Sequence, residues 1–111
     1  MRICDRPLTR EELETLAASG LGDVIKGVVD VRREKLALNA DQHVQLKELL
    51  ERNGSDETDL WGINLFPGQE QMLEYSSMIN VRPEQGNRTL EVKDPALQAQ
   101  IAQVVEKWTI R

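Results

Sequence analysis

The stretch VIKGVVDVRREKLAL, residues 24–38, decides the fold of this chain. Its first part alternates with period two, placing Ile25 and Val29 on one side and Lys26 and Asp30 on the other. Such alternation, with β-branched residues at most inward positions, is typical of a half-buried strand. Charged residues then form a turn, and the apolar end of the stretch returns as a second strand. The stretch therefore predicts an antiparallel hairpin.

Two helices flank this hairpin in the sequence. Thr9 followed by Glu12 is a capping box, which predicts a helix over about residues 9–19. Residues 39–41 cap a second helix with leucines on its apolar face, and Gly54 ends it at a left-handed position.

The second half of the chain contains two apolar stretches that each end at a proline. Residues 60–66 end at Pro67, and residues 75–82 end at Pro83. Because proline lacks the N–H group that a strand ladder needs, each stretch is predicted as a strand that stops there.

Asp94 and Pro95 begin the last predicted helix, because Asp is a good N-cap and Pro a good first residue. The helix carries a single apolar stripe, formed by Leu97, Ile101, Val104, Val105 and Trp108. With a short first strand at residues 3–4, the order of elements becomes β-α-β-β-α-β-β-α.

This order predicts an α+β fold with a largely antiparallel sheet and helices packed on one face. The first six elements also match the split β-α-β order of ferredoxin-like folds, so a ferredoxin-like core is one arrangement we consider. The 111 residues suit one domain, which we expect to cover residues 1–111.

Composition limits the classes of partner. The net charge is −5, and nucleic-acid binding draws most of its affinity from neutralised phosphates, so neither a nucleic acid nor an anionic membrane is expected. We expect a cytoplasmic location, because the chain has no apolar run of the ~20 residues that cross a bilayer and no signal-peptide core. With one cysteine and one histidine, and no cofactor motif, no metal or cofactor is expected.

A polar loop follows the second of these prolines. Arg82 and Arg88 flank a turn that contains Gly86. Arginine binds carboxylate and phosphate groups bidentately, and Gly and Asn favour turns whose N–H groups form an anion nest. The predicted ligand-binding residues are Asn64, Asn80, Arg82, Gln85, Gly86, Asn87 and Arg88. The alternative is a solvated loop whose arginines pair with nearby carboxylates.

Asn64 and Asn80 stand at equivalent places, each after an isoleucine and three residues before a proline. Asparagine is depleted in strands and costs stability unless its amide is paired. The two therefore line a polar pocket or bond neighbouring backbone, unless the match reflects only two strands that end alike.

His43 is the only histidine, at the edge of the apolar face of the second helix. It is either the general base of a small hydrolase or a hydrogen-bonded core histidine.

Residues 59–67 and 79–88 resemble a family of small bacterial proteins of unknown function. The resemblance covers most of the chain and is most specific at residues 85–88. It implies one intact domain and directs attention to His43 and the predicted ligand-binding residues, but it implies no reaction. In that family an Asp follows the His by two residues, a place that Gln45 occupies here, which weakens any inferred His–Asp pair.

We therefore expect a binding module for a small anionic ligand at the loop after the last strand. The alternatives are a small hydrolase with His43 as general base and a protein-interaction module, and a homo-oligomer is compatible with each. A hydrogen bond from His43 to residues 82–88 would favour the hydrolase. A buried His43 bonded only to backbone would favour the binding module, and a large exposed apolar patch would favour the interaction module.

Overall fold

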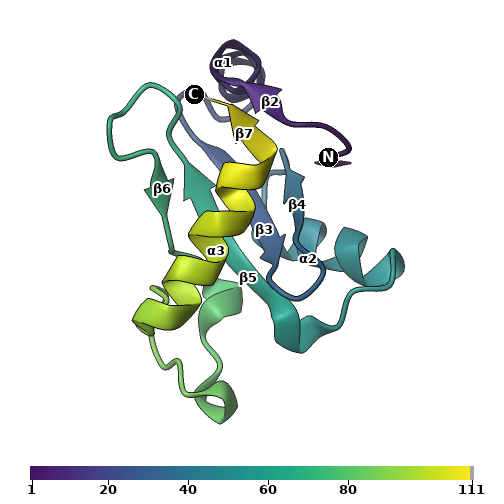
Figure 1. The fold of residues 1–111 in the computed structure, drawn as a ribbon, viewed down its shortest axis with the longest axis vertical. Coiled ribbons are helices and arrows are strands. Elements are labelled where there is room, and N and C mark those ends of the chain that lie inside the picture. The colour runs from purple at the N-terminus through teal and green to yellow at the C-terminus, as the bar shows by residue number, and fades with distance from the viewer. Residues whose placement is uncertain (111) are drawn as a thin grey trace.

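The structure is a computed structural model that describes residues 1–110. Its helices are α1 (Arg10–Ser19), α2 (His43–Arg52) and α3 (Pro95–Trp108) (Figure 1). Its strands are β1 (Arg2–Ile3), β2 (Leu8–Thr9), β3 (Ile25–Asp30), β4 (Lys35–Leu38), β5 (Leu60–Leu65), β6 (Leu73–Glu74) and β7 (Thr109–Ile110). Single turns of 3-10 helix cover Glu57–Asp59, Met78–Asn80 and Pro83–Gln85.

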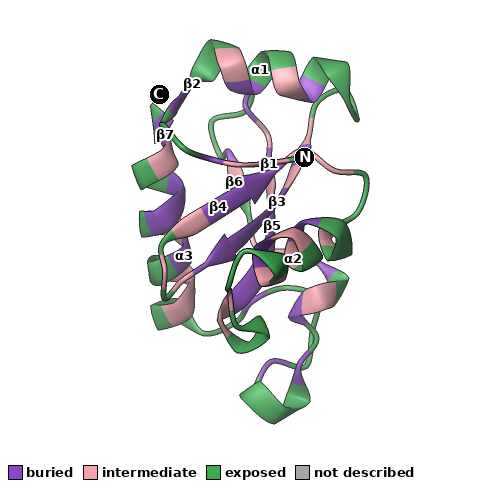
Figure 2. Ribbon diagram, turned by 90° about the vertical axis from the view of Figure 1, so that its right-hand side faces the viewer, coloured by how far each residue is buried: buried purple, intermediate pink, exposed green. Residues whose placement is uncertain are grey.

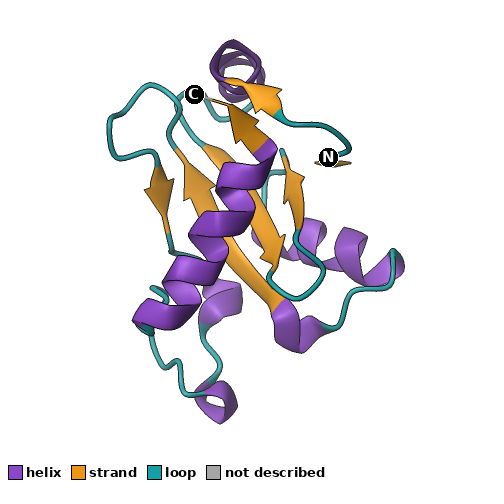
Figure 3. Cartoon of the chain, viewed as in Figure 1, coloured by secondary structure: helices purple, strands orange, loops and turns teal. Residues whose placement is uncertain are grey.

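Five strands form one sheet in the order β1-β4-β3-β5-β6, and every neighbouring pair is antiparallel. The predicted hairpin is β3–β4, and β5 pairs with β3 along its full length. A separate parallel pair, β2–β7, joins the two ends of the chain, and the sequence pattern did not reveal it. The α+β class and the largely antiparallel sheet are thus confirmed (Figure 3).

Helices cover both faces of this sheet, rather than the single face that we predicted. On β5, Trp61 and Ile63 pack into a core cluster with α1 and α3, while Leu60 packs into a second cluster with α2. Figure 2 shows α3 and α2 on opposite sides of the strands. Because strand residues alternate between faces, the sheet is buried on both sides, and this explains why β3 is apolar at consecutive positions Val28 and Val29.

The direction of the two crossovers explains this arrangement. In the unit β1-α1-β3 the two strands are parallel and β4 lies between them, and in the unit β4-α2-β5 the two strands are parallel and β3 lies between them. Both connections cross the sheet in the same direction, from the β1 edge toward the β6 edge. The two units start from strands that run in opposite directions, so right-handed connections put their helices on opposite faces. In a ferredoxin-like core the last strand flanks the first, whereas β5 here flanks β3, so that core is not formed.

The predicted strand over residues 75–82 is wrong. After β6, Ser76 makes one bridge to Glu91, and the chain then turns into a 3-10 helix. Ser77 is the N-cap of this turn, since its Oγ accepts a hydrogen bond from the N–H of Ile79 at 3.2 Å. The strand ends early because a capping serine begins a helical turn before the alternation is complete.

The apolar stripe of α3 packs against the sheet as predicted. Ile101, Val104 and Val105 are buried, and Leu97 and Trp108 are half-buried against the same cluster. Within residues 1–110, no helix has both the length and the apolar character needed to span a membrane.

Candidate functional site

The outer edge of β5 organises the polar residues that the sequence singled out. The N–H of Val31 donates to the carbonyl of Asp59 at 3.1 Å, which fixes the alternation of the β3–β5 ladder. By that alternation, Leu60, Gly62 and Asn64 turn their backbone N–H and C=O groups away from β3. Each of these residues therefore needs a partner on the far side.

Three different groups supply those partners. Asn64 pairs with the backbone of β6. Gly62 pairs with the side-chain amide of Asn80, and the carbonyl of Leu60 accepts a hydrogen bond from the guanidinium of Arg82. Side chains thus continue the edge of the sheet where β6 stops.

Asn80 is fully buried and every polar atom of its amide is bonded. Its Oδ1 accepts from the N–H of Gly62 at 2.7 Å, and its Nδ2 donates to the carbonyls of Gly62 and Leu90 at 2.9 and 3.2 Å. An ideal Cβ built on Gly62 would lie 2.4 Å from the Cβ of Ser77, so only glycine permits this close approach.

Arg82 is buried and directs its guanidinium into the protein. Nε donates to Ile79 O at 2.9 Å, Nη1 donates to Glu57 O at 2.8 Å, and Nη2 bonds the carbonyl of Leu60. The guanidinium carbon lies 4.4 Å from the centre of the Trp61 ring. Burial lowers the pKa of Arg82 from its ordinary value, opposed by the nearby carboxylates of which Glu57 is the first.

The loop after Arg82 is closed by paired backbone groups. Arg82 and Asn87 exchange two N–H···O=C bonds of 2.7 and 3.1 Å, and Gly86 between them adopts φ 83°. Gln85 bridges outward from the loop, accepting from Arg82 Nη1 at 3.3 Å and donating to Thr58 O at 3.0 Å. The loop is therefore a rigid turn.

Asn87 ties this turn to the segment that follows. Its Nδ2 lies 2.8, 3.0 and 3.1 Å from the carbonyl oxygens of Asn80, Thr89 and Glu91. Its Oδ1 accepts from the N–H of Lys93 at 3.2 Å. Asn87 is buried, so its amide serves the backbone of this chain.

The structure brings Asn80, Arg82, Gln85 and Asn87 into one hydrogen-bonded network, but it turns the donors of Asn80, Arg82 and Asn87 inward. Of the two arginines predicted to bind an anion, Arg82 is buried and Arg88 is exposed. Arg88 makes no ion pair within residues 1–110. The prediction that Arg82 holds an external anion therefore does not fit this structure, because its donors are bonded to carbonyls of the chain.

His43, the first residue of α2, lies at another part of β5. Its Nε2 donates to the carbonyl of Ile63 at 2.7 Å. Burial lowers the pKa of His43 below its ordinary value, and the hydrogen bond to Ile63 partly offsets this. Asn64, on the same strand, has its Nδ2 bonded to Glu74 Oε1 at 2.7 Å and to Ser76 O at 3.0 Å. His43 is half-buried, and within residues 1–110 none of its hydrogen bonds reaches residues 82–88, the contact that would have favoured a hydrolase.

Two other reactive side chains are also directed inward. Asp30 is fully buried in the β3–β4 turn, where Oδ1 accepts from the N–H groups of Arg32 and Arg33 and Oδ2 accepts from Ser55 Oγ at 2.6 Å. Burial raises the pKa of the Cys4 thiol to about 11. In the part of the chain that the structure describes, no group of three His, Cys, Asp or Glu side chains is placed to hold a metal ion.

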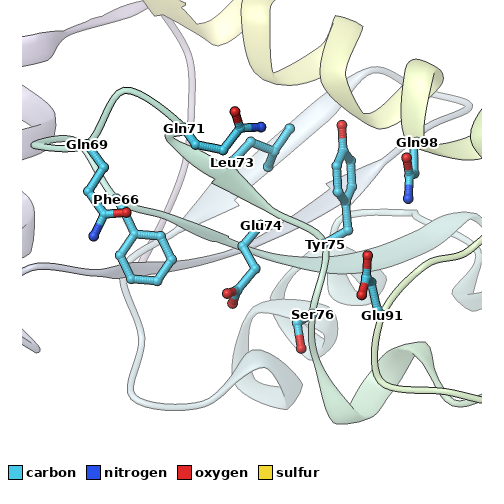
Figure 4. Close-up of a pocket in the computed structure, with 9 residues that line it drawn as sticks. All are labelled: Phe66, Gln69, Gln71, Leu73, Glu74, Tyr75, Ser76, Glu91 and Gln98. Carbon is cyan, nitrogen blue, oxygen red and sulfur yellow. The ribbon is translucent and has the colours of Figure 1, made fainter.

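A hollow of about 690 Å³ lies along the outer edge of β6. It is lined by amide, carboxylate and aromatic side chains, namely Phe66, Gln69, Gln71, Leu73, Glu74, Tyr75, Ser76, Glu91 and Gln98 (Figure 4). Sequence reasoning missed it, because these residues come from three separate segments that only the tertiary fold brings together.

The backbone of β6 is open toward this hollow. The N–H of Phe66 donates to Met72 O at 2.8 Å, which fixes the alternation of the β5–β6 ladder. By that alternation Leu73 turns its N–H and C=O away from β5. The free edge ends at Tyr75, because the carbonyl of Tyr75 already accepts a hydrogen bond from the N–H of Val92 at 3.0 Å.

Side chains on the two faces of this edge differ in chemistry. In Figure 4, Tyr75 rises toward α3 beside Gln98, whereas Glu74 and Ser76 point to the opposite face. Burial and the charge of Glu106 raise the pKa of Tyr75, so its hydroxyl stays protonated at neutral pH.

Comparison with known proteins gives one result. Neither the curated proteins nor the solved structures include a match to this chain. A family model described as a protein of unknown function, DUF5674, matches residues 2–108. This match includes every residue of the network and of the hollow described above, and with it the resemblance noted in the sequence is confirmed: the chain belongs to the DUF5674 family.

Proposed function

We propose that this chain is a peptide-binding module, and that the outer edge of β6 receives an extended segment carrying basic side chains. The observation that carries the proposal is the open edge at Leu73, which faces a hollow of about 690 Å³. The binding-module hypothesis is kept, but its site moves from residues 82–88 to β6 and the charge of its ligand is reversed.

Backbone geometry supports strand addition. An extended peptide that lies beside an open edge gains main-chain hydrogen bonds, while pockets for alternate side chains supply specificity. Leu73 offers one N–H and one C=O for this purpose, and the pairing of Tyr75 with Val92 limits the added strand to a few residues. Such a short edge is also a weak template for aggregation, as sheet edges in native proteins tend to be.

Charge selects the class of peptide. The carboxylates of Glu74 and Glu91 lie on the wall of the hollow, and no Lys, Arg or His lines it. The whole chain carries a net charge of −5, so its field favours a cation and disfavours an anion. Because side chains of a strand alternate, we expect basic residues toward Glu74 and apolar residues toward Leu73 and Tyr75.

The lining also argues against catalysis in this hollow. Neither Cys nor His is among its lining residues, and the carboxylates on the wall beside Ser76 are those of Glu74 and Glu91. The carboxylates there belong to exposed residues, and Asn64 holds Glu74. Binding without covalent chemistry is the function that these side chains support.

Titration of the labelled chain with a blocked hexapeptide of alternating Lys and Val tests the proposal. We expect NMR amide shifts confined to residues 71–76 and to Glu91, with an affinity that falls as salt rises. Glu74→Gln is expected to weaken binding, whereas Glu48→Gln, an exposed site on α2, is the matched control.

Two altered peptides separate strand addition from plain charge attraction. N-methylation at alternate residues removes the donors for the Leu73 carbonyl, and we expect it to abolish the shifts. Replacing Lys by Glu in the peptide is expected to do the same. Equal binding of the acidic peptide, or shifts scattered over all acidic surfaces, would contradict the proposal.

A further inference from the structure

A second hollow adjoins the one at the edge of β6. It has a volume of about 250 Å³ and is lined by residues 70–73 and Tyr75 on one side and by Ala102, Val105 and Glu106 of α3 on the other. We call it the α3 hollow. Gln71, Leu73 and Tyr75 line both hollows, so a side chain of a strand added at the edge of β6 can reach the α3 hollow.

The two hollows follow one row of side chains on α3. Gln98, Ala102 and Glu106 stand four residues apart, which places them on one side of the helix. Gln98 lines the first hollow, and Ala102 and Glu106 line the α3 hollow. Leu73 and Tyr75 both pack against the core cluster that contains the buried residues of α3. The α3 hollow therefore lies on the face of β6 that is turned toward this helix.

The lining of the α3 hollow is amphipathic. Met72 and Val105 are buried and apolar, whereas Glu70 and Glu106 are exposed and form no ion pair within residues 1–110. The charge of Glu106 contributes to the raised pKa of Tyr75, so its carboxylate lies close to that ring. No Lys, Arg or His lines the hollow. Pockets for whole small molecules usually measure about 300–1,000 Å³, so this smaller hollow suits a single side chain.

We propose that the α3 hollow receives one long basic side chain, a lysine or an arginine, of the peptide that adds to β6. Such a side chain lays its aliphatic stem on apolar surface and keeps its charged head at the water boundary, here beside Glu70 and Glu106. The inference rests on the proposed function and refines it, because one residue expected to be apolar next to Leu73 and Tyr75 carries a cationic head. Basic side chains then lie on both faces of the added strand, toward Glu74 on one and toward Glu106 on the other.

A substitution series in the peptide tests this proposal. Each valine of the alternating Lys and Val hexapeptide is replaced in turn by lysine, and binding is followed by the NMR amide shifts of the full chain. We expect one replacement to tighten binding about fivefold, with new shifts at Ala102 and Glu106. Norleucine at the same position keeps the aliphatic stem but lacks the ammonium group, so we expect it to give no such gain. Equal gains from lysine at every valine position would indicate general charge attraction and would overturn the proposal.

Two variants of the protein locate the gain. Glu106→Gln is expected to remove the advantage of the added lysine over norleucine, whereas Glu48→Gln, which changes the net charge equally, is expected to keep it. An advantage that persists in Glu106→Gln would overturn the proposal. If the parent peptide shifts residues 71–76 but no position prefers lysine, this inference fails and the proposed function stands. If none of the peptides binds at β6, both fail, so the two failures are distinguishable.

Discussion

The side-chain amide of Asn80 makes both of the hydrogen bonds that a neighbouring strand would make to the backbone of Gly62. The amide has a donor and an acceptor side by side, as a peptide group has, so one side chain extends the sheet by one residue. Two residues further along the chain, Arg82 does the same for the carbonyl of Leu60. The residues that suggested a ligand site therefore complete the fold.

Asn80→Asp isolates the donor half of that amide. The substitution keeps the size of the side chain but leaves the carbonyls of Gly62 and Leu90 without their donor and buries a carboxylate. We expect the free energy of unfolding in urea to fall by about 3 kcal/mol or more. Asn53→Asp, at an exposed helix end, is expected to cost less than about 1 kcal/mol. Equal losses would show that Asn80 is not a strand substitute.

Arg82→Lys tests whether the guanidinium fork itself is needed. A single ammonium keeps the charge but cannot reach the carbonyls of Ile79, Glu57 and Leu60 together. Unsatisfied buried carbonyls are expected to lower the free energy of unfolding by about 2–3 kcal/mol, read from the urea midpoint. Arg88→Lys should change it little, because Arg88 is exposed. A site for an external anion would instead show both variants equally stable.

The local signals of the sequence were sufficient for the hairpin and for α3. Period-two alternation in β3 and the Asp94–Pro95 start of α3 depend on neighbours a few residues apart, and both elements formed as predicted. The segment 77–82 misled, because alternating apolar and polar residues read as a strand. Whether Asn80 offers its backbone or its side chain to β5 is decided by Gly62, which is 18 residues away.

The same limit applies to the candidate site. Asn80, Arg82 and Asn87, three of the residues singled out in the sequence, share one hydrogen-bonded network. The sequence could not predict that these side chains point into the protein. They do so because the backbone groups of Gly62 and Leu60, on the edge of β5 that no strand pairs, need hydrogen-bond partners. The hollow beside β6 escaped for a related reason: Glu91 and Gln98 reach its wall only through the tertiary fold.

His43 gives the chain a pH dependence that a single substitution can remove. Burial lowers the folded-state pKa of His43 below its ordinary value of 6.5, so the unfolded chain binds the proton first as pH falls. The stability that neutral His43 contributes is therefore complete above pH 6.5 and is lost as pH falls through the folded-state pKa. We expect wild type to lose more stability than His43→Gln between about pH 7.5 and 5. Because His43 is the only histidine, parallel curves would contradict this assignment.

Gly62→Ala tests the close approach on which the Asn80 pairing depends. The added Cβ would lie 2.4 Å from the Cβ of Ser77, so we expect a loss of about 3 kcal/mol in the free energy of unfolding. Gly68→Ala is the matched control, because no atom lies within 4 Å of its Cβ position.

Ser77→Gly supplies the other half of a double-mutant cycle. Alone it is expected to cost only about 0.3 kcal/mol, because it removes the Ser77 Oγ cap at Ile79 but glycine is itself tolerated at an N-cap. Combined with Gly62→Ala it removes the two closest of the clashing atoms and leaves Ile79 Cγ1 at 3.1 Å, so the double variant should be more stable than Gly62→Ala alone. Additive losses would mean that contact between these two residues does not set the requirement for glycine. If the double variant is more stable than the sum of the single losses predicts, the small size of residue 62 is what allows Asn80 to bond β5. A larger residue at position 62 would keep the 77–80 turn too far from β5 for these hydrogen bonds.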